Sequence, residues 1–328
     1  MKLSEIGEFG FIDRLRRRAP GGAELVLGIG DDCAASRLAP GELLLTSTDL
    51  LIEEVHFRRD WSDLKTLGRK CVSVNVSDVA AMGGEPSSLY LGLGIPAGFG
   101  VEDLDAFADG VLAACAEYGA VLAGGDTCGS PGPLFISVTV QGRVPEDQLL
   151  TRAGARPGDL LWVSGRLGES ALALRELLAG GRPGPSAANA HHDPRARVAL
   201  GRALAAQGLA TALIDISDGL LADLGHILDS SAVGALVESA ALPLGPDLRA
   251  SLAADPSLID LALSGGEDYE LLFTSPPALA PAVAALGTEL VPVTQIGRIL
   301  PQGDGLRLLD AQGRPRKPSR SGFNHFGS

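Results

Sequence analysis

Short acidic stretches follow apolar runs at six places along the chain, and this pattern restricts the folds that suit it. The six stretches are Gly30-Asp31-Asp32, Ser47-Thr48-Asp49, Ser77-Asp78, Gly124-Gly125-Asp126, Asp215-Ile216-Ser217-Asp218 and Gly265-Gly266-Glu267-Asp268. An α/β sheet can bring carboxylates that follow its strands to one cleft. Carboxylate oxygens suit Mg²⁺ that also coordinates substrate phosphates, and without cations they would repel one another. The pattern therefore predicts a multi-metal phosphate site.

Length and charge narrow the class of protein further. A chain of 328 residues with 45% apolar residues is long enough for two domains. The balance of 27 basic against 40 acidic residues, net −13, argues against a nucleic-acid or anionic-membrane partner. The first residues lack the apolar core of a secretory signal, and no apolar run approaches the ~20 residues that span a bilayer. We therefore expect a cytoplasmic protein.

Alternating apolar patterns predict an α/β organisation in both halves. In the first half, strands are expected at 25–29, 43–46, 88–95, 120–123 and 134–144, and helices at 64–82 and 101–118. The second and fourth of these strands would end next to Asp49 and Asp126. Residues 145–158 are rich in Pro, Gly and charge and mark a boundary near residue 148. The expected domains are 1–148 and 149–328.

The second half is expected to alternate in the same way. Strands are predicted at 160–164 and 212–216, and helices at 167–178, at 194–207 and from 219 to about 228. Residues 180–185 are expected to form a loop, and His191-His192 a solvated one.

Simpler explanations exist for each acidic residue taken alone. Asp218 could cap the helix that follows it, and Asp31-Asp32 could close a turn. The combination favours a functional site, because several of these segments lie beside glycines, where phosphates can approach backbone N–H groups. Neither a P-loop nor a G-x-S-x-G hydrolase motif occurs. The four cysteines have no metal-binding spacing and are expected to be reduced, with Cys71 and Cys115 in the core.

Seven motifs together resemble the thiamine-monophosphate kinase family. They are Gly28-Ile29-Gly30-Asp31-Asp32-Cys33-Ala34, Ser47-Thr48-Asp49, His56-Phe57, Asn75-Val76-Ser77-Asp78-Val79-Ala80-Ala81-Met82-Gly83, Gly124-Gly125-Asp126-Thr127, Asp215-Ile216-Ser217-Asp218-Gly219 and Leu263-Ser264-Gly265-Gly266-Glu267-Asp268-Tyr269-Glu270. The ending Gly322-Phe323-Asn324-His325-Phe326 is similar too. The resemblance implies an α/β (α+β) fold like that of aminoimidazole ribonucleotide synthetase. It has an N-terminal mixed sheet with helices, which dimerises through its strands, and a C-terminal α/β domain.

The resemblance also implies an activity, the transfer of the γ-phosphoryl group of ATP to thiamine monophosphate with several Mg²⁺ ions in the site. The acceptor is a phosphate monoester with a second pKa of about 6, so direct in-line transfer needs neither a covalent nucleophile nor a general base. Alternatives are another ATP-dependent synthetase of the superfamily, a metal-dependent phosphatase and a non-catalytic nucleotide-binding protein. The chain lacks the terminal cysteines expected of selenophosphate synthetase and of the hydrogenase-maturation factor, which favours the kinase.

The family motifs assign roles to particular residues. The implied Mg²⁺ ligands are Asp32, Asp49, Asp78, Asp126, Asp215 and Asp218, supported by Asp31 and by the oxygens of Ser47 or Thr48. The implied ATP contacts are Gly125, Asp126, Arg152 and Ser217, with Lys70 as a weaker candidate that is expected on the surface. The implied thiamine monophosphate contacts are His56, Glu267 or Asp268, and Phe323. For Arg152 a solvated linker arginine is the alternative, and Phe323 could simply pack the terminal segment.

Overall fold

The structure is a computed structural model, and it describes residues 14–19, 25–27 and 35–317. The chain forms two compact units. The first contains Met1–Val79 and Gly84–Asp147, and the second contains Ala80–Gly83 and Gln148–Ser328. Each unit has its own sheet, as the alternating sequence patterns predict.

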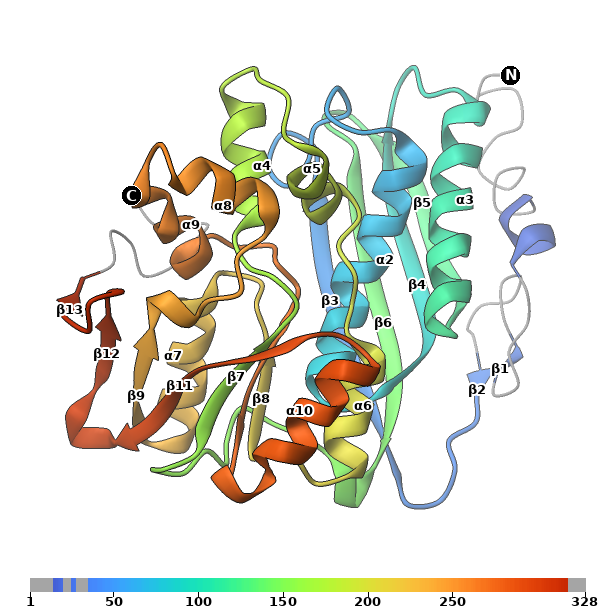
Figure 1. Ribbon diagram of the computed structural model, residues 1–328. Helices are drawn as coiled ribbons and strands as arrows, with labels where there is room; N and C mark the ends of the chain where they lie inside the picture. Colours follow the sequence, from blue (N-terminus) through green and yellow to red (C-terminus); the bar gives the residue numbers. More distant parts are fainter. Residues whose placement is uncertain (1–13, 20–24, 28–34, 318–328) are drawn as a thin grey trace. The chain divides into compact units, whose positions relative to one another are not determined.

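A four-stranded mixed sheet forms the centre of the first unit. Its order is β3 (Glu42–Ile52), β6 (Phe135–Pro145), β4 (Glu85–Pro96) and β5 (Val121–Ser130). β6 is antiparallel to both of its neighbours, and β4 runs parallel to β5. Helices α2 (Leu64–Ala81) and α3 (Val101–Tyr118) lie on the same side of this sheet (Figure 1). A short pair, β1 (Leu25–Leu27) and β2 (Ala35–Ser36), precedes it.

Two strands of this sheet extend further than the sequence predicts. β3 continues through Asp49 to Ile52, and β5 continues through Asp126 to Ser130. Both are held by long ladders, β3 against β6 and β5 against β4, and the ladder hydrogen bonds extend the strands past the polar residues. The expectation that Asp49 and Asp126 follow strand ends is therefore wrong, because both lie inside strands.

Helices α2 and α3 approach each other closely at two glycines. A Cβ at Gly110 would overlap the carbonyl oxygen of Lys65, and one at Gly68 would overlap that of Phe107. Glycine thus lets the two backbones touch, and this contact fixes the helix that carries Asp78. The helix expected at 101–118 is confirmed, and it ends at Gly119 in the left-handed conformation.

Substituting Gly110 should therefore test the helix contact. We expect Gly110→Ala to lower the free energy of unfolding by about 2 kcal/mol, because the added methyl group forces the helices apart. Gly225, in a helix of the second unit, has open space around its Cβ position. Gly225→Ala should instead be neutral or stabilising by up to about 1 kcal/mol, because alanine favours a helix interior. Urea denaturation measures both, and equal effects would contradict the close contact.

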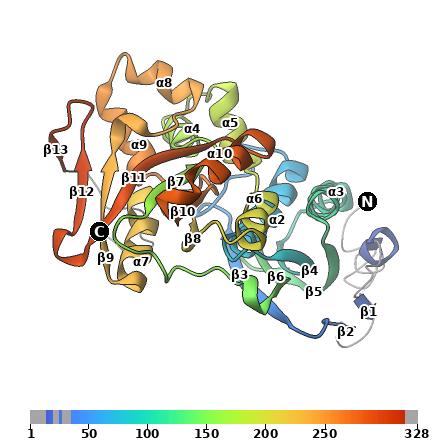
Figure 2. The ribbon, with the colours of Figure 1, turned by 60° about the horizontal axis from the view of Figure 1, so that its bottom comes forward.

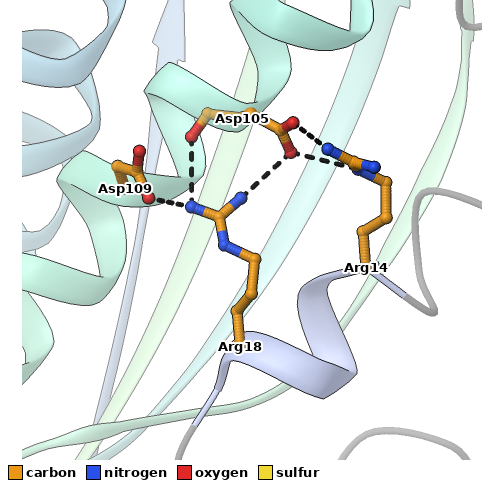
Figure 3. A network of polar contacts seen from close by, with 4 residues as sticks. All are labelled: Arg14, Arg18, Asp105 and Asp109. Carbon is orange, nitrogen blue, oxygen red and sulfur yellow. Dashed lines mark hydrogen bonds and ion pairs between the residues drawn. The ribbon is translucent and has the colours of Figure 1, made fainter.

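Residues 14–18 form a helical turn that binds to α3 through charge (Figure 3). The guanidinium groups of Arg14 and Arg18 both donate to the carboxylate of Asp105, with Arg14 Nε at 3.2 Å and Arg18 Nη1 at 3.0 Å from Oδ1. Arg18 also pairs with Asp109. Leu15, which lies between the two arginines in the chain, is buried. The first helical residues described are thus held against α3.

The second unit contains a seven-stranded sheet. Its order is β13 (Pro315–Arg316), β12 (Leu306–Leu309), β9 (Val233–Glu238), β11 (Val293–Pro301), β7 (Leu160–Ser164), β10 (Leu271–Ser275) and β8 (Ala212–Asp215). All pairings are antiparallel except that of β12 with β9. The helices are α4 (Glu169–Leu178), α5 (Pro185–His192), α6 (Val198–Ala206), α7 (Leu220–Ser231), α8 (Pro246–Leu252), α9 (Ile259–Ser264) and α10 (Ala280–Glu289).

Two apolar clusters cover the two faces of this sheet. One includes Val163 and Ile214 together with α4 and α7, and the other includes Trp162 and Phe273 together with α6 and α10. Neighbouring residues of β7 thus point to opposite clusters, which explains the continuous apolar run of that strand. In Figure 2, α7 lies beside β9 and α10 lies beside β11.

Part of the second unit differs from the sequence expectation. Residues 185–192 form α5, which begins with a proline at its first helical position. His191 lies in this helix and is buried, so the expectation of a solvated loop is wrong. In the described part of the chain, no helix is both long and apolar enough to cross a membrane.

Candidate functional site

Three of the predicted metal-site residues come together in the first unit. Ser47 and Asp49 lie two residues apart on β3, so they share the face that α2 covers. Asp78 projects from α2, and its Oδ2 accepts a hydrogen bond of 2.6 Å from the Ser47 hydroxyl. These three residues are thus neighbours in the structure, although the strand itself does not end there.

The electrostatics of this group suit a bound cation. Burial, and then the charge of Asp78, raise the pKa of Asp49 to about 6. In the same helix Asn75 is completely buried, and its Oδ1 has no hydrogen-bond partner among the described residues. The two carboxylates and the hydroxyl of this group are hard donors of the kind that Mg²⁺ prefers. The residues present therefore fit the ion that the sequence implies.

Two other predicted ligands of the first unit lie elsewhere. Thr48 projects to the opposite face, where its hydroxyl donates to the carbonyl oxygen of Val138 at 3.1 Å. Asp126 is exposed and pairs with Gly92 of β4. Gly92 in turn pairs with Ser137 of β6, and Ser137 pairs with Leu50 of β3. Asp126 is therefore on the face of Leu50 rather than that of Asp49. Gly125, at φ 154°, precedes it in a conformation that favours glycine.

The remaining candidates of the first unit have varied surroundings. The ring nitrogen Nδ1 of His56 accepts the N–H of Ile52 at 3.0 Å, so in neutral His56 the hydrogen is on Nε2. Lys70 is buried, so the expectation of a surface lysine is wrong. In the second unit Arg152 is exposed, which is compatible both with an ATP contact and with a solvated linker arginine.

A second group of predicted residues surrounds the end of β8. Asp215 is the last residue of this strand and is buried. The N–H groups of Ser217, Asp218 and Gly219 all donate to Oδ2 of Asp223, each at 3.1 Å. The cap position of α7 is Gly219, without a side-chain hydrogen bond. The alternative that Asp218 caps the helix is therefore wrong, because Asp223 takes the amides there.

Asp223 is a functional candidate that sequence reasoning missed. Burial raises its pKa to about 6, although the three amide hydrogen bonds oppose this shift. The residue lies inside the helix, five positions after Asp218, where a carboxylate usually contributes only to the helix dipole. The only signal in the sequence was an acidic residue in the first turn of the helix that follows Ser217-Asp218-Gly219.

The loop from Ser264 to Glu270 lies against this segment. Glu267 N–H donates to the carbonyl oxygen of Ser217, and Tyr269 N–H to that of Ile216, both at 2.8 Å. A Cβ at Gly266 would overlap the same Ser217 oxygen, so glycine permits the close approach. The two predicted motifs, far apart in the sequence, therefore form one continuous surface within the second unit.

The two acidic candidates of this loop differ in their surroundings. Both carboxylate oxygens of Asp268 accept the N–H of Gly168, at 3.0 and 3.1 Å. Burial raises the pKa of Asp268 well above its usual range. The side chain of Glu267 is 27% exposed, and its Oε2 lies 3.3 Å from Nδ1 of the buried His191. Glu267 is thus the more accessible of the two.

Some predicted residues fall outside the described part of the chain, namely Asp31, Asp32 and Phe323. Within residues 14–19, 25–27 and 35–317, no three His, Cys, Asp or Glu side chains are grouped so as to hold a metal ion. Asp49 and Asp78 form a pair of carboxylates, with Ser47 as its hydroxyl neighbour.

Comparison with known families defines the class to which this fold belongs. Residues 30–144 match the family model of the AIR synthase related protein N-terminal domain, and residues 156–308 match that of the C-terminal domain. The chain is thus built from two AIR synthase related domains, and the expected two-domain α/β fold is confirmed.

Relatives within this class are more specific. The chain is 38% identical to a thiamine-monophosphate kinase of Escherichia coli K12 over 329 residues, covering 98% of each chain. The crystal structure of the thiamine-monophosphate kinase of Stenotrophomonas maltophilia K279a has a TM-score of 0.84 and 38% identity, and covers 95% of this chain and 98% of its own. The structure of AaThiL complexed with AMPPCP and TMP has a TM-score of 0.77 and 35% identity over 99% of both chains. The chain therefore belongs to the thiamine-monophosphate kinase family, a family of phosphotransferase enzymes.

Proposed function

We propose that the chain transfers the γ-phosphoryl group of ATP directly to the phosphate of thiamine monophosphate, giving thiamine diphosphate and ADP. The observation that carries this proposal is the group formed by Ser47, Asp49 and Asp78, together with the family's complex with AMPPCP and TMP. Under this proposal the first domain, residues 1–148, contributes ATP-associated Mg²⁺ ligands and the dimer contact. The second domain, residues 149–328, contributes nucleotide and substrate contacts.

The side chains of this site would act by binding and by positioning. A phosphate monoester has a second pKa of about 6, so near neutral pH its oxygen is already largely deprotonated, and no residue has to remove a proton. A covalent thiol intermediate has no support in the described core, because burial raises the pKa of both Cys71 and Cys115 to about 12. In-line attack then depends on how the two substrates are held.

Several Mg²⁺ ions, when bound, would supply the charge that offsets repulsion between the two anionic substrates. Asp49 and Asp78 would hold one such ion, with the Ser47 hydroxyl fixing the orientation of Asp78. Asp215 and Asp218 are the corresponding candidates of the second unit. The inferred ATP contacts remain Gly125, Asp126, Arg152 and Ser217. Those to thiamine monophosphate remain His56, Glu267 or Asp268, and Phe323, and Glu267 is the more accessible of the two acids.

The activity is tested by incubating the protein with ATP, Mg²⁺ and thiamine monophosphate and by separating the thiamine compounds by chromatography. We expect thiamine diphosphate from the monophosphate and none from unphosphorylated thiamine. ADP release without thiamine diphosphate would point to another acceptor and contradict the proposal. Free phosphate as the main product would favour the phosphatase alternative.

We also propose that the chain forms a homodimer through the sheet of the first unit. α2 and α3 lie on one side of this sheet, where Leu51, Leu91 and Val138 are buried. On the other side Leu44 and Leu50 of β3 are 52% and 50% exposed. Exposed leucines on one face of a sheet favour pairing with a second copy.

The double substitution Leu44→Glu with Leu50→Glu should prevent this pairing. We expect the dissociation constant of the dimer to rise at least about tenfold, because two charges would have to be buried. Light scattering across a dilution series measures the mass, and Leu178→Glu, at an exposed leucine of the second unit, is the matched control. A wild-type monomer at micromolar concentration would contradict the dimer.

A further inference from the structure

Two side chains from separate parts of the second unit, those of Ser170 and Glu267, meet at the ring of His191. This histidine ends α5 and is 2% exposed. Its Nδ1 lies 3.0 Å from the hydroxyl oxygen of Ser170, in α4, and 3.3 Å from Oε2 of Glu267. Ser170 is completely buried. Two helices thus fix the imidazole ring, and the ring in turn contacts the loop that carries Glu267.

The partners of Nδ1 determine where the ring hydrogen lies. An ionised carboxylate can only accept hydrogen bonds, whereas a serine hydroxyl can either donate or accept. The approach of Nδ1 to the Glu267 carboxylate is attractive when Nδ1 carries a hydrogen, and Ser170 is compatible with that arrangement. When Nδ1 carries the ring hydrogen, as it does in the charged ring, His191 presents an N–H to Glu267.

The backbone of Glu267 is fixed independently of its side chain. Its φ of 66° lies in the left-handed region, which a residue with a side chain keeps only where its surroundings hold it. Its N–H donates to the carbonyl oxygen of Ser217 at 2.8 Å. With the backbone held in this way, the direction of the Glu267 carboxylate depends on what its side chain contacts. One of these contacts is with the buried ring of His191.

Glu267 remains accessible to a ligand while it makes this contact. Its side chain is 27% exposed, whereas the neighbouring Asp268 has both oxygens on the N–H of Gly168. A carboxylate held at a partly exposed position attracts a cation better than a mobile one, because less rotamer freedom is lost on binding. Thiamine monophosphate carries such a cation in its thiazolium ring.

We propose that His191, held by Ser170, is a positioning residue that orients the carboxylate of Glu267 toward the cationic part of thiamine monophosphate. The inference rests on the proposed function, and on Glu267 as a substrate contact within it. His191 itself would not touch the reacting phosphates. It should therefore affect the binding of the acceptor and leave ATP and the transfer step nearly unchanged.

Steady-state kinetics of the full chain with ATP, Mg²⁺ and thiamine monophosphate test this inference. We expect His191→Leu to raise the KM for thiamine monophosphate about tenfold, with kcat and the KM for ATP within about twofold of wild type. His191→Asn should restore the KM to within about threefold, because its amide nitrogen can donate from nearly the position of Nδ1. His226→Leu, on the exposed side of α7, is the control and should match wild type.

Glu267→Gln and the double variant with His191→Leu separate the possible failures. We expect Glu267→Gln to raise the same KM about tenfold or more, and the double variant to be no worse than Glu267→Gln alone. A raised KM in Glu267→Gln with a normal KM in a folded His191→Leu would overturn the positioning role while keeping the proposed function. A normal KM in Glu267→Gln would overturn both the substrate contact and this inference. If His191→Leu unfolds, Ser170→Ala, which removes the hydroxyl that holds the ring, replaces it, and a normal KM for thiamine monophosphate in that folded variant would equally overturn the positioning role.

Discussion

Replacing Asp49 by Asn is expected to remove almost all kinase turnover and, without metal, to make the protein more stable above pH 6. Asp49 is partly buried beside Asp78, and this environment raises its pKa to about 6. Removing the charge relieves the repulsion between the two carboxylates. It also removes an anionic Mg²⁺ ligand, so turnover should fall at least about a hundredfold.

The pH dependence of this effect follows from the direction of the shift. The pKa of Asp49 is higher in the folded than in the unfolded chain, so its ionisation favours unfolding. This destabilisation is absent at low pH and develops as the pH rises through about 6. After allowance for partial exposure, it amounts to about 1–2 kcal/mol.

Thermal unfolding with and without Mg²⁺, at pH 5 and pH 8, measures this prediction. In metal-free buffer the variant should have the higher Tm at pH 8, and the difference should shrink at pH 5. Mg²⁺ should raise the Tm of wild type more than that of the variant. Glu42→Gln, at the start of the same strand, is the control and should change neither property. A variant with normal turnover at saturating Mg²⁺ would remove Asp49 from the metal site.

Replacing Asp223 by Ala should cause the other large effect. Three backbone N–H groups would lose their common acceptor, and Asp223 is 2% exposed, so water reaches this position poorly. We expect a loss of about 3 kcal/mol in the free energy of unfolding. Turnover should fall at least about tenfold, because the same amides hold the segment that carries Ser217 and Asp218.

The comparison with two further variants makes this test specific. Asp223→Asn keeps an oxygen acceptor and should lose less than about 1 kcal/mol, because the buried carboxylate already has a raised pKa. Asp229→Ala removes an exposed acid from the same helix and should have no effect. Urea denaturation and initial rates measure all three. Equal losses for the Ala and Asn variants would show that the amides do not need Asp223 as acceptor.

Sequence patterns could predict the α/β fold, and the family resemblance named Asp49 and Asp78 as members of one set of Mg²⁺ ligands. The positions of Ser47 and Asp49 on one strand face follow from the alternation of side chains. The strand ends could not be predicted, because the ladder with β6 carries β3 past Asp49. The same tertiary pairing carries β5 through Asp126, which puts this residue on the face of Leu50.

The polar contacts between distant segments were beyond sequence reasoning. Nothing in the residues around His191 indicates that Ser170 and Glu267 meet its ring, because the three are separated by long stretches of chain. The helix that contains His191 was also missed, since a run of glycines and prolines precedes its first residue. The roles of Asp32 and Phe323 remain predictions, because both lie outside the described residues.

The carboxylate of Asp223 has a consequence for the design of inhibitors. In many enzymes, an inhibitor gains affinity by presenting a phosphate or sulfonate to the free amides at the beginning of a helix. At α7 the chain already satisfies these amides with its own acid, so an anionic group aimed there would meet negative charge instead of donors. A compound directed at this loop should instead present hydrogen-bond donors, or a cation, to Glu267.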